Sequence, residues 1–435
     1  MRPTDKVSVL PEEDAPPPEP HAASVPASTA QQAARTDLRF EPVTEPPPVN
    51  VGNHPNSIDH TTRSIHDRWS AQLKRTPCGS ASPSGVRMTL SVPVPSAADA
   101  APVAMLTEPV TGPSAWLARD FTGEDDWVTV LTAEEVRELD EAVAALCDHE
   151  RPLGELTLAD FPLPTLTKTL EQAVQDLEFG CGFTVLRGLP VERWSLEEAR
   201  LAYWGIALHL GTPVSQNASG ELIAHVRDYG EGGLDQPTTR AYRTRNALPF
   251  HTDSSDIVGL LCLRSAGQGG GVSTLASSMT VYNHLLAHHR ELLGLFYRGF
   301  VYDRRTEEGS QELPYYRNAV YGWFDGQLSC RFYMTHYIES AVAHTGIPLS
   351  DIERYALRLF QDIAARDEHR VEMTLRPGDL QLLNNNVLVH GRSAYEDEPG
   401  RRRDLLRLWL NTRSARRIPD HFARFRHGMP TTRRA

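Results

Sequence analysis

A histidine and an aspartate separated by one residue form the first candidate site in the chain. His251 and Asp253 lie in the stretch Phe250-His251-Thr252-Asp253. Residues i and i+2 of a β-strand point to the same face, so the imidazole and the carboxylate could meet one metal ion. The plainer alternative is a strand-end pair that makes ordinary hydrogen bonds. The tripeptide alone favours that alternative.

A second histidine, much later in the chain, favours the metal-site interpretation over ordinary hydrogen bonds. His390 ends the apolar stretch Val387-Leu388-Val389. The interval after Asp253 is long enough for the chain to return on another strand of the same barrel. Two histidines and one carboxylate on one face form the facial triad of non-haem Fe(II) oxygenases, which leaves coordination positions open for a cosubstrate and oxygen. His251, Asp253 and His390 are therefore the predicted iron ligands.

Two arginines follow within an apolar stretch near the C-terminus. Arg403 and Arg407 flank Asp404-Leu405-Leu406, and alternate residues of a strand share a face. Both guanidinium groups could therefore point into one cavity, where a planar fork suits a carboxylate. Structural salt bridges are the alternative, because a buried arginine must be paired in some way.

Other patterns are less informative. The run Gly269-Gly270-Gly271 indicates a flexible turn, since it lacks the context of a dinucleotide or phosphate loop. The chain has no HExxH and no GxSxG motif. His225 is a weak pocket candidate on a strand that precedes the site. A group of aromatic residues is better explained as hairpin core than as a pocket wall: Tyr315, Tyr316, Tyr321, Trp323, Phe332 and Tyr333.

Local patterns predict the elements that would position these residues. Capping boxes at Thr132–Glu135, Ser195–Glu198 and Ser350–Glu353 each predict the start of a helix. Apolar periodicity predicts further helices over 166–177, ending at Gly180, and over 280–296. Asp325-Gly326 predicts a hairpin turn. Strands are predicted over 183–186, 222–226, 258–263, 320–324, 327–333, 380–383, 387–389 and 405–410.

This order of elements predicts an α+β, mainly β fold. Many strands, with helices grouped largely before them, favour a β-barrel or jelly roll braced by helices. The 32 prolines of the chain concentrate before residue 114, among Ala, Ser, Thr and Glu. Residues 1–114 are therefore expected to be a disordered extension, with a docking or regulatory tail as the alternative. The folded domain is predicted over 115–425, followed by a short basic tail over 426–435.

Composition excludes several classes of protein. The formal net charge of −12 argues against general nucleic-acid binding. No apolar stretch is long enough for a membrane-spanning helix, and no secretory signal is recognisable, so the cytoplasm is the expected compartment. The five cysteines form no CxxC pair, which argues against a disulfide framework or a cysteine zinc site. The sequence gives no indication of oligomeric state.

Taken together, these motifs resemble the taurine dioxygenase (TauD/TfdA-like) family. The resemblance rests on His251-Thr-Asp253, the stretch Gly270-Gly271-Val-Ser-Thr274, the strand from Asn384 to His390, and Arg402-Arg403-x-x-x-Arg407. It covers about residues 170 to 415. The motifs occur in the family's order, which makes the combination more specific than any one of them.

The resemblance implies a fold, cofactors and residue roles. The fold would be a double-stranded β-helix, a distorted jelly roll, with flanking helices. The cofactors would be Fe(II), 2-oxoglutarate as cosubstrate, and O2. Arg403 and Thr274 would bind the remote carboxylate of 2-oxoglutarate, and Arg407 would face an anionic group of the substrate. Ala247 stands where the family has a polar residue, which argues against taurine as the substrate.

The predicted function is oxidation of a C–H bond in a small, anionic or amino-acid-like molecule, with release of succinate and CO2. Hydroxylation is favoured, because Asp253 occupies the position where Gly or Ala would indicate a halogenase. Desaturation or cyclisation at the same iron centre is the first alternative. A non-catalytic jelly-roll protein that binds a metal as a sensor is the second.

Overall fold

The computed structural model describes residues 104–148, 150–230, 240–267, 269–305, 313–412, 416–419 and 421–431. The predicted disordered extension therefore lies outside the described residues up to position 103. From residue 104 the chain lies against the domain. The backbone N–H of Leu106 donates to the Tyr297 hydroxyl (3.1 Å), and that of Val110 donates to Asn283 Oδ1 (2.7 Å). These two contacts lie before residue 114, the expected end of the extension.

Two larger sheets position the candidate site. The seven-stranded sheet has the order β1-β2-β13-β6-β15-β3, with β4 also paired to β15, and the four-stranded sheet has the order β12-β7-β14-β5. The first contains β1 (Val128–Val130), β2 (Phe183–Arg187), β13 (Asp379–Asn384), β6 (Ile257–Arg264), β15 (Asp404–Thr412), β3 (Gly211–Val214) and β4 (Ile223–Val226). The second contains β12 (Arg370–Met373), β7 (Ser273–Ser277), β14 (Leu388–Arg392) and β5 (Leu248–His251).

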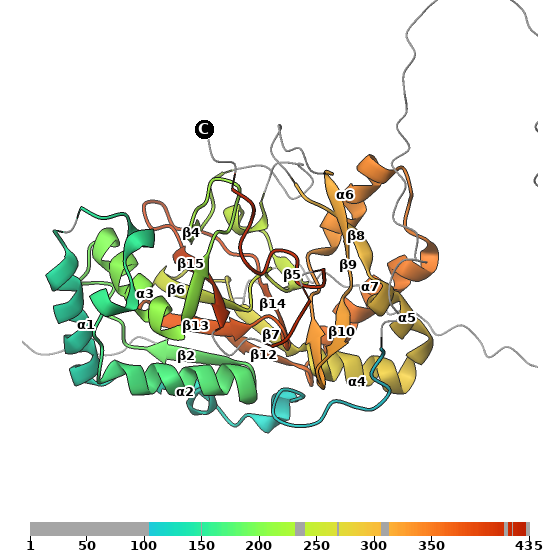
Figure 1. Cartoon of the computed structure of the whole chain (residues 1–435), viewed down its shortest axis with the longest axis horizontal. Helices are drawn as coiled ribbons and strands as arrows, with labels where there is room; N and C mark the ends of the chain where they lie inside the picture. Colours follow the sequence, from blue (N-terminus) through green and yellow to red (C-terminus); the bar gives the residue numbers. More distant parts are fainter. Residues whose placement is uncertain are drawn as a thin grey trace, which may run out of the picture. The chain divides into compact units, whose positions relative to one another are not determined.

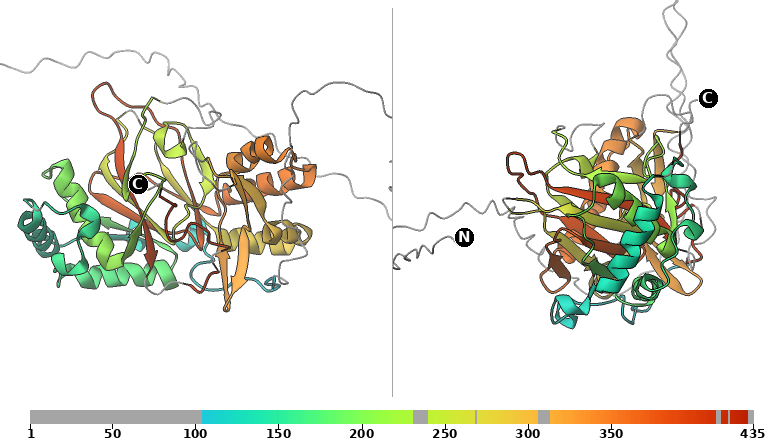
Figure 2. Two further views of the ribbon diagram at one scale, coloured as in Figure 1. Left: turned by 45° about the horizontal axis from the view of Figure 1, so that its top comes forward. Right: turned by 90° about the vertical axis from the view of Figure 1, so that its left-hand side faces the viewer.

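Helices flank the sheets on two sides, as Figures 1 and 2 show. One group is α1 (Ala133–Leu146), α2 (Leu166–Phe179) and α3 (Leu196–Leu210), and the other is α4 (Ser278–His288), α5 (Leu293–Arg298), α6 (Thr335–Thr345) and α7 (Asp351–Ala364). The remaining strands form two hairpin-like pairs, β8 (Phe300–Asp303) with β9 (Tyr315–Asn318) and β10 (Tyr321–Phe324) with β11 (Gln327–Cys330). This mixture of helices and sheets agrees with the expected α+β class.

Strand alternation divides the core into two parts. In β13, Leu380 and Leu382 pack with the apolar faces of α1–α3, whereas Leu383 belongs to the cluster on the other side of the sheet. Gln381, between the two leucines, is fully buried and exchanges hydrogen bonds with Ser273 of β7 (3.0–3.1 Å). The two sheets are therefore linked by a polar contact in their shared interior.

Most of the predicted elements are present. All three capping boxes form, with Thr132, Ser195 and Ser350 accepting from the backbone N–H three residues later. The Asp325-Gly326 turn has positive φ at both residues (49° and 77°), as expected for a tight hairpin.

The helix predicted over 280–296 is instead two helices. The backbone leaves the helical region at His289 (φ −141°, ψ 41°), and a 3-10 turn follows before α5 begins. The strand predicted over 327–333 ends at Cys330, and α6 and β7 were not predicted. No helix within the described ranges combines the length and apolar character that crossing a membrane requires.

A buried ion pair fixes the edge of β13 against β2. Asp379 is fully buried and accepts from Nε and Nη2 of Arg187 (2.8 and 3.0 Å) and from the backbone N–H of Arg376 (2.9 Å). We expect Asp379→Ala to lower the free energy of unfolding by about 3 kcal/mol, because Arg187 would lose its buried partner. Urea denaturation measures the change.

The matched control is Glu134→Ala, which removes an exposed carboxylate 3.7 Å from Arg137. Exposed pairs contribute little, so its effect should stay below about 0.5 kcal/mol. Equal effects of the two substitutions would contradict the structural role given to Asp379.

Candidate active site

The structure brings the three predicted iron ligands together. His251 ends β5, and His390 lies directly opposite it on the antiparallel strand β14. The ligating atoms of His251, Asp253 and His390 all lie within 4.8 Å of one another, and all three residues are buried. Nε2 of His390 is 3.9 Å from Oδ2 of Asp253, and the two imidazole centroids are 4.4 Å apart. Within the described ranges, no other group of three or more such side chains is this close.

Neighbouring groups orient the ligands. Nδ1 of His251 lies 2.9 Å from the carbonyl of Pro249, and a donor there leaves Nε2 free to ligate. The backbone N–H of Asp253 donates to Oδ1 of Asn385 (2.9 Å), and that of Thr252 donates to the carbonyl of Phe332 (2.7 Å). The loop that carries Asp253 is therefore tied to the segment just before β14.

The protonation states suit metal binding. Burial lowers the pKa of His251, and it lowers that of His390 to about 3. Burial alone would raise the pKa of Asp253, but Arg407 and the two imidazoles outweigh it and the net pKa is lowered. At neutral pH the site therefore presents two neutral imidazoles and one carboxylate, the forms that ligate. This buried two-histidine, one-carboxylate set fits Fe(II).

A cavity of about 490 Å³ opens beside the triad. Both large sheets contribute to its wall, through Leu260, Leu405 and Trp409 on one side and Ser273 and Leu248 on the other. Arg403, which directly precedes β15, and Arg407 within β15 also line it. The predicted iron ligands and both arginines therefore border the same cavity.

Arg403 is buried and packed on an aromatic ring. Its guanidinium carbon lies 5.0 Å from the centroid of Tyr395, and its backbone N–H donates to Oδ1 of Asp397 (2.7 Å). Nη1 has no hydrogen-bond partner among the described residues. Burial lowers the pKa of this arginine, which lacks an ion-pair partner within the described chain. A buried cation with a free donor fits the carboxylate of a bound cosubstrate.

The glycine run permits the close approach of Arg403. Gly270 and Gly271 have φ of 79° and 66°, which favours glycine, so the turn interpretation is confirmed. A Cβ at Gly271 would lie 2.9 Å from Nε of Arg403. Any larger residue there would push the guanidinium aside.

The structure does not bring Thr274 to the cavity. Thr274 pairs with Gly391 and with Glu372, a side chain that is 50% exposed, whereas Ser273 pairs with Arg392. Residues directly opposite in a sheet share a face, so Thr274 points away from the side that holds His390. Ser273 lines the cavity. The role of Thr274 toward the cosubstrate stays a prediction, and Ser273 is the residue of this pair that lines the cavity.

Arg407 lines the cavity and contacts one of the predicted iron ligands. Its Nη1 is 3.4 Å from Oδ1 of Asp253, and its Nε donates to Oε1 of Gln216 (2.7 Å). Its guanidinium carbon lies 4.5 Å from the centroid of Tyr242. Arg407 therefore already supports an iron ligand, and its expected contact with substrate stays a prediction.

Other candidates have different roles. His225 lies 2.8 Å from Asp404 through Nδ1 and does not line the cavity. Of the aromatic group interpreted as core, Tyr316 and Tyr333 line the cavity, while Tyr321 and Phe332 are fully buried. Sequence reasoning missed Gln216, Tyr242 and Arg392. The strand alternation that joined His251 to Asp253 would have found Arg392, two residues after His390.

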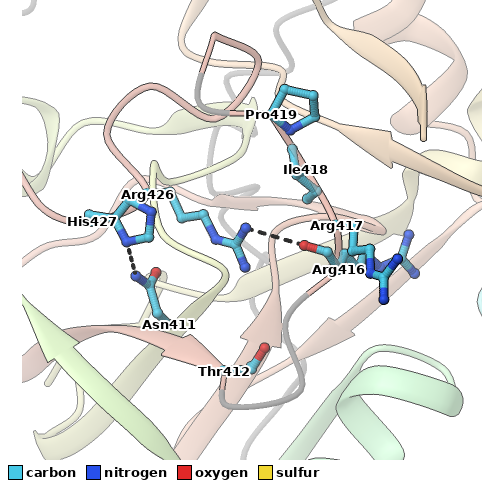
Figure 3. Close-up of a pocket in the computed structure, with 8 residues that line it drawn as sticks. All are labelled: Asn411, Thr412, Arg416, Arg417, Ile418, Pro419, Arg426 and His427. Atoms are coloured by element: carbon cyan, nitrogen blue, oxygen red, sulfur yellow. Dashed lines mark hydrogen bonds between the residues drawn. The ribbon is translucent and has the colours of Figure 1, made fainter. Parts of the chain in front are cut away.

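A second, shallower hollow lies near the end of the described chain. Its lining residues are Asn411, Thr412, Arg416, Arg417, Ile418, Pro419, Arg426 and His427 (Figure 3). Arg426 donates to the carbonyl of Arg416 (3.2 Å) and pairs with the buried Asp256 (3.0 Å). These contacts hold Arg426, the first residue of the expected basic tail, against the rest of the chain. Of the described residues that line it, none has a carboxylate side chain.

Comparison with known proteins identifies relatives of the chain. Residues 149–409 match the sequence profile of the taurine catabolism dioxygenase TauD, TfdA family. The FR-33289 synthase of Streptomyces rubellomurinus is 40% identical over 331 residues, which covers 75% of this chain and 97% of that protein. The taurine hydroxylase-like protein SAT17 of Stachybotrys chartarum is 31% identical, over 68% of this chain and 77% of that protein.

Solved structures share the fold. Asparagine oxygenase in complex with Fe(II), 2S,3S-3-hydroxyasparagine and succinate superposes with a TM-score of 0.50 at 21% identity. The match covers 66% of this chain and 94% of that chain. At this level of identity the likeness concerns the architecture.

Asn385 offers a test of how the metal site is supported. Its Oδ1 accepts from the Asp253 backbone, and its Nδ2 donates to the carbonyl of Ser255 (3.1 Å). We expect Asn385→Ala to weaken Fe(II) binding by about 10- to 100-fold, as is typical for groups that orient metal ligands. Anaerobic metal titration measures the change. An affinity equal to that of the parent would contradict the proposed support.

The strand register gives a second prediction. Ser273→Ala should weaken 2-oxoglutarate binding by about 5-fold, because one neutral hydrogen bond would be lost. Thr274→Val should leave it unchanged, since this side chain lies on the other face of β7. Calorimetric titration of the Fe(II)-loaded protein with 2-oxoglutarate compares the two. The reverse order of effects would show that the register is misassigned.

Proposed function

The chain belongs to the taurine catabolism dioxygenase TauD/TfdA family, and from that premise we propose that it hydroxylates a small, anionic or amino-acid-like molecule. It is an Fe(II)- and 2-oxoglutarate-dependent dioxygenase that acts on a small molecule. The identity of the substrate and the outcome of the oxidation form the proposal.

The observation that carries the proposal is the meeting of two separate binding sets in one cavity. His251, Asp253 and His390 would hold Fe(II), and Arg403 with Ser273 would bind the remote carboxylate of 2-oxoglutarate. When bound, the iron and cosubstrate supply the oxidising power, with succinate and CO2 as the coproducts. The protein contributes ligation, orientation and a wall that limits access of water.

The rest of the cavity supports an anionic substrate. Arg240 lines it in addition to Arg407, and the aromatic rings of Tyr242, Tyr316 and Tyr333 contribute to its wall. Among the described residues, the acidic side chains of the lining are Asp253, which belongs to the triad, and Asp303. The surplus of cationic groups favours a ligand with at least one negative charge. The aromatic surfaces would pack on its carbon skeleton.

Hydroxylation is the favoured outcome because the full triad is present. With Asp253 as a ligand, no coordination position is freed for a halide. Desaturation or cyclisation at the same centre remains the alternative, and the product of the natural substrate would separate it from hydroxylation. The buried triad and Arg403 together are more than a metal-binding sensor would need.

We further infer that the two larger sheets form the double-stranded β-helix of the family. The contact between Gln381 and Ser273, and a cavity lined from both sheets, support this arrangement. A cytoplasmic location, the absence of nucleic-acid or membrane partners, and the domain limits at 115 and 425 remain predictions.

Removal of a ligand tests the function without knowledge of the substrate. His251→Ala and Asp253→Ala should each lower the uncoupled conversion of 2-oxoglutarate to succinate, with Fe(II) and ascorbate present, by more than about 100-fold. The reason is that each variant loses a direct iron ligand.

The matched control is His288→Ala, an exposed histidine at the end of α4, which should retain parental turnover. Circular dichroism should show that all three variants are folded. Parental succinate formation by either ligand variant would refute the assignment of the triad.

A further inference from the structure

Arg392 is a second buried arginine beside the iron ligands. It lies two residues after His390 on β14, so the two side chains share a face of the sheet. Its side chain lines the same cavity, although the residue is only 7% exposed. Neither the iron ligation nor the contacts of Arg403 and Arg407 use it.

Only part of its guanidinium is engaged. Nη2 donates to the backbone carbonyls of Thr244 (2.8 Å) and Asn246 (2.6 Å), just before β5. Nε and Nη1 are buried and have no hydrogen-bond partner among the described residues. Neutral carbonyls hold the group in place, but they leave its charge and two of its donor atoms unsatisfied. Burying such a group lowers the stability of the protein unless a ligand balances its charge and accepts its hydrogen bonds.

Arg392 and Arg403 share one aromatic support. The centroid of the Tyr395 ring lies 4.8 Å from the guanidinium carbon of Arg392 and 5.0 Å from that of Arg403. Nη1 of Arg403 is likewise buried without a partner among the described residues. In that part of the chain, neither arginine has a carboxylate within ion-pair distance. Asp397 accepts from the backbone of Arg403 rather than from its side chain.

These contacts indicate a common ligand for the two arginines. Two neighbouring cations repel each other, and an anion between them would remove both the repulsion and the unmet donors. Of the two arginines, the family resemblance assigns Arg403 alone to 2-oxoglutarate. We propose that Arg392 joins Arg403 in a two-arginine site for the remote carboxylate of 2-oxoglutarate, and that it sets the preference for keto acids with a second carboxylate.

The test compares two keto acids on one variant. Arg392→Gln removes the charge but keeps an amide donor for the Thr244 and Asn246 carbonyls. The Fe(II)-loaded protein is titrated anaerobically with 2-oxoglutarate and with 2-oxobutanoate, which lacks the remote carboxylate. The visible charge-transfer absorption reports binding. We expect the dissociation constant for 2-oxoglutarate to rise at least 10-fold and that for 2-oxobutanoate to stay within 2-fold of the parent value.

Three further variants complete the experiment. Arg403→Gln should show the same selectivity between the two keto acids, and Arg392→Lys should recover part of the affinity for 2-oxoglutarate. Arg376→Gln, which removes an exposed arginine paired with Glu124 outside the cavity, should match the parent for both ligands. Fe(II) affinity should be unchanged in all of them, because no iron ligand is altered.

Two results would overturn the proposal. Equal weakening of both keto acids by Arg392→Gln would mean that Arg392 acts only by holding the segment before β5. Unchanged binding of both would mean that its free donors serve something other than the cosubstrate. If the parent itself failed to bind 2-oxoglutarate, the family activity, and not the role of Arg392, would be in question.

Discussion

The antiparallel pairing of β5 with β14 is the constraint on which the site depends. It places His390 directly opposite His251, although the two residues are far apart in the sequence. A metal ion needs its ligands within a few ångströms, and the register of two strands can supply that from positions far apart in sequence. A shift of one residue would turn His390 to the other face and replace it with Gly391 or Val389. The sheet is therefore as much a part of the metal site as the ligands.

The strands that position the iron ligands also determine how charge is distributed in the cavity. Arg407 faces Asp253 and Gln216, so its charge is balanced within the protein. Arg392 and Arg403 have no such partner among the described residues, and both lie against Tyr395. The charge of Arg407 is thus balanced by protein groups, whereas the charges of Arg392 and Arg403 are not balanced by a described carboxylate. The unpaired donor atoms of these two arginines therefore mark the part of the cavity that we propose for the cosubstrate.

Sequence patterns predicted the parts of the site that follow from local rules. His251, Asp253 and His390 were recognisable because ligand type and strand alternation are both visible in the chain. The sequence did not indicate which of the adjacent Ser273 and Thr274 lines the cavity, because that choice depends on the register, which alternation alone does not provide. The break at His289 was missed because the apolar periodicity continues across it. Gln216 and Tyr242 reach the cavity through tertiary packing, for which no local pattern exists.

The end of the described chain has a practical consequence. The family profile stops at residue 409, yet Phe425, Met429 and Thr431 line the cavity, and Met429 exchanges hydrogen bonds with Ser215 (2.7 and 3.0 Å). This part of the wall therefore lies outside the residues that match the family profile. A purification tag or fusion partner joined shortly after Thr431 would begin next to the cavity.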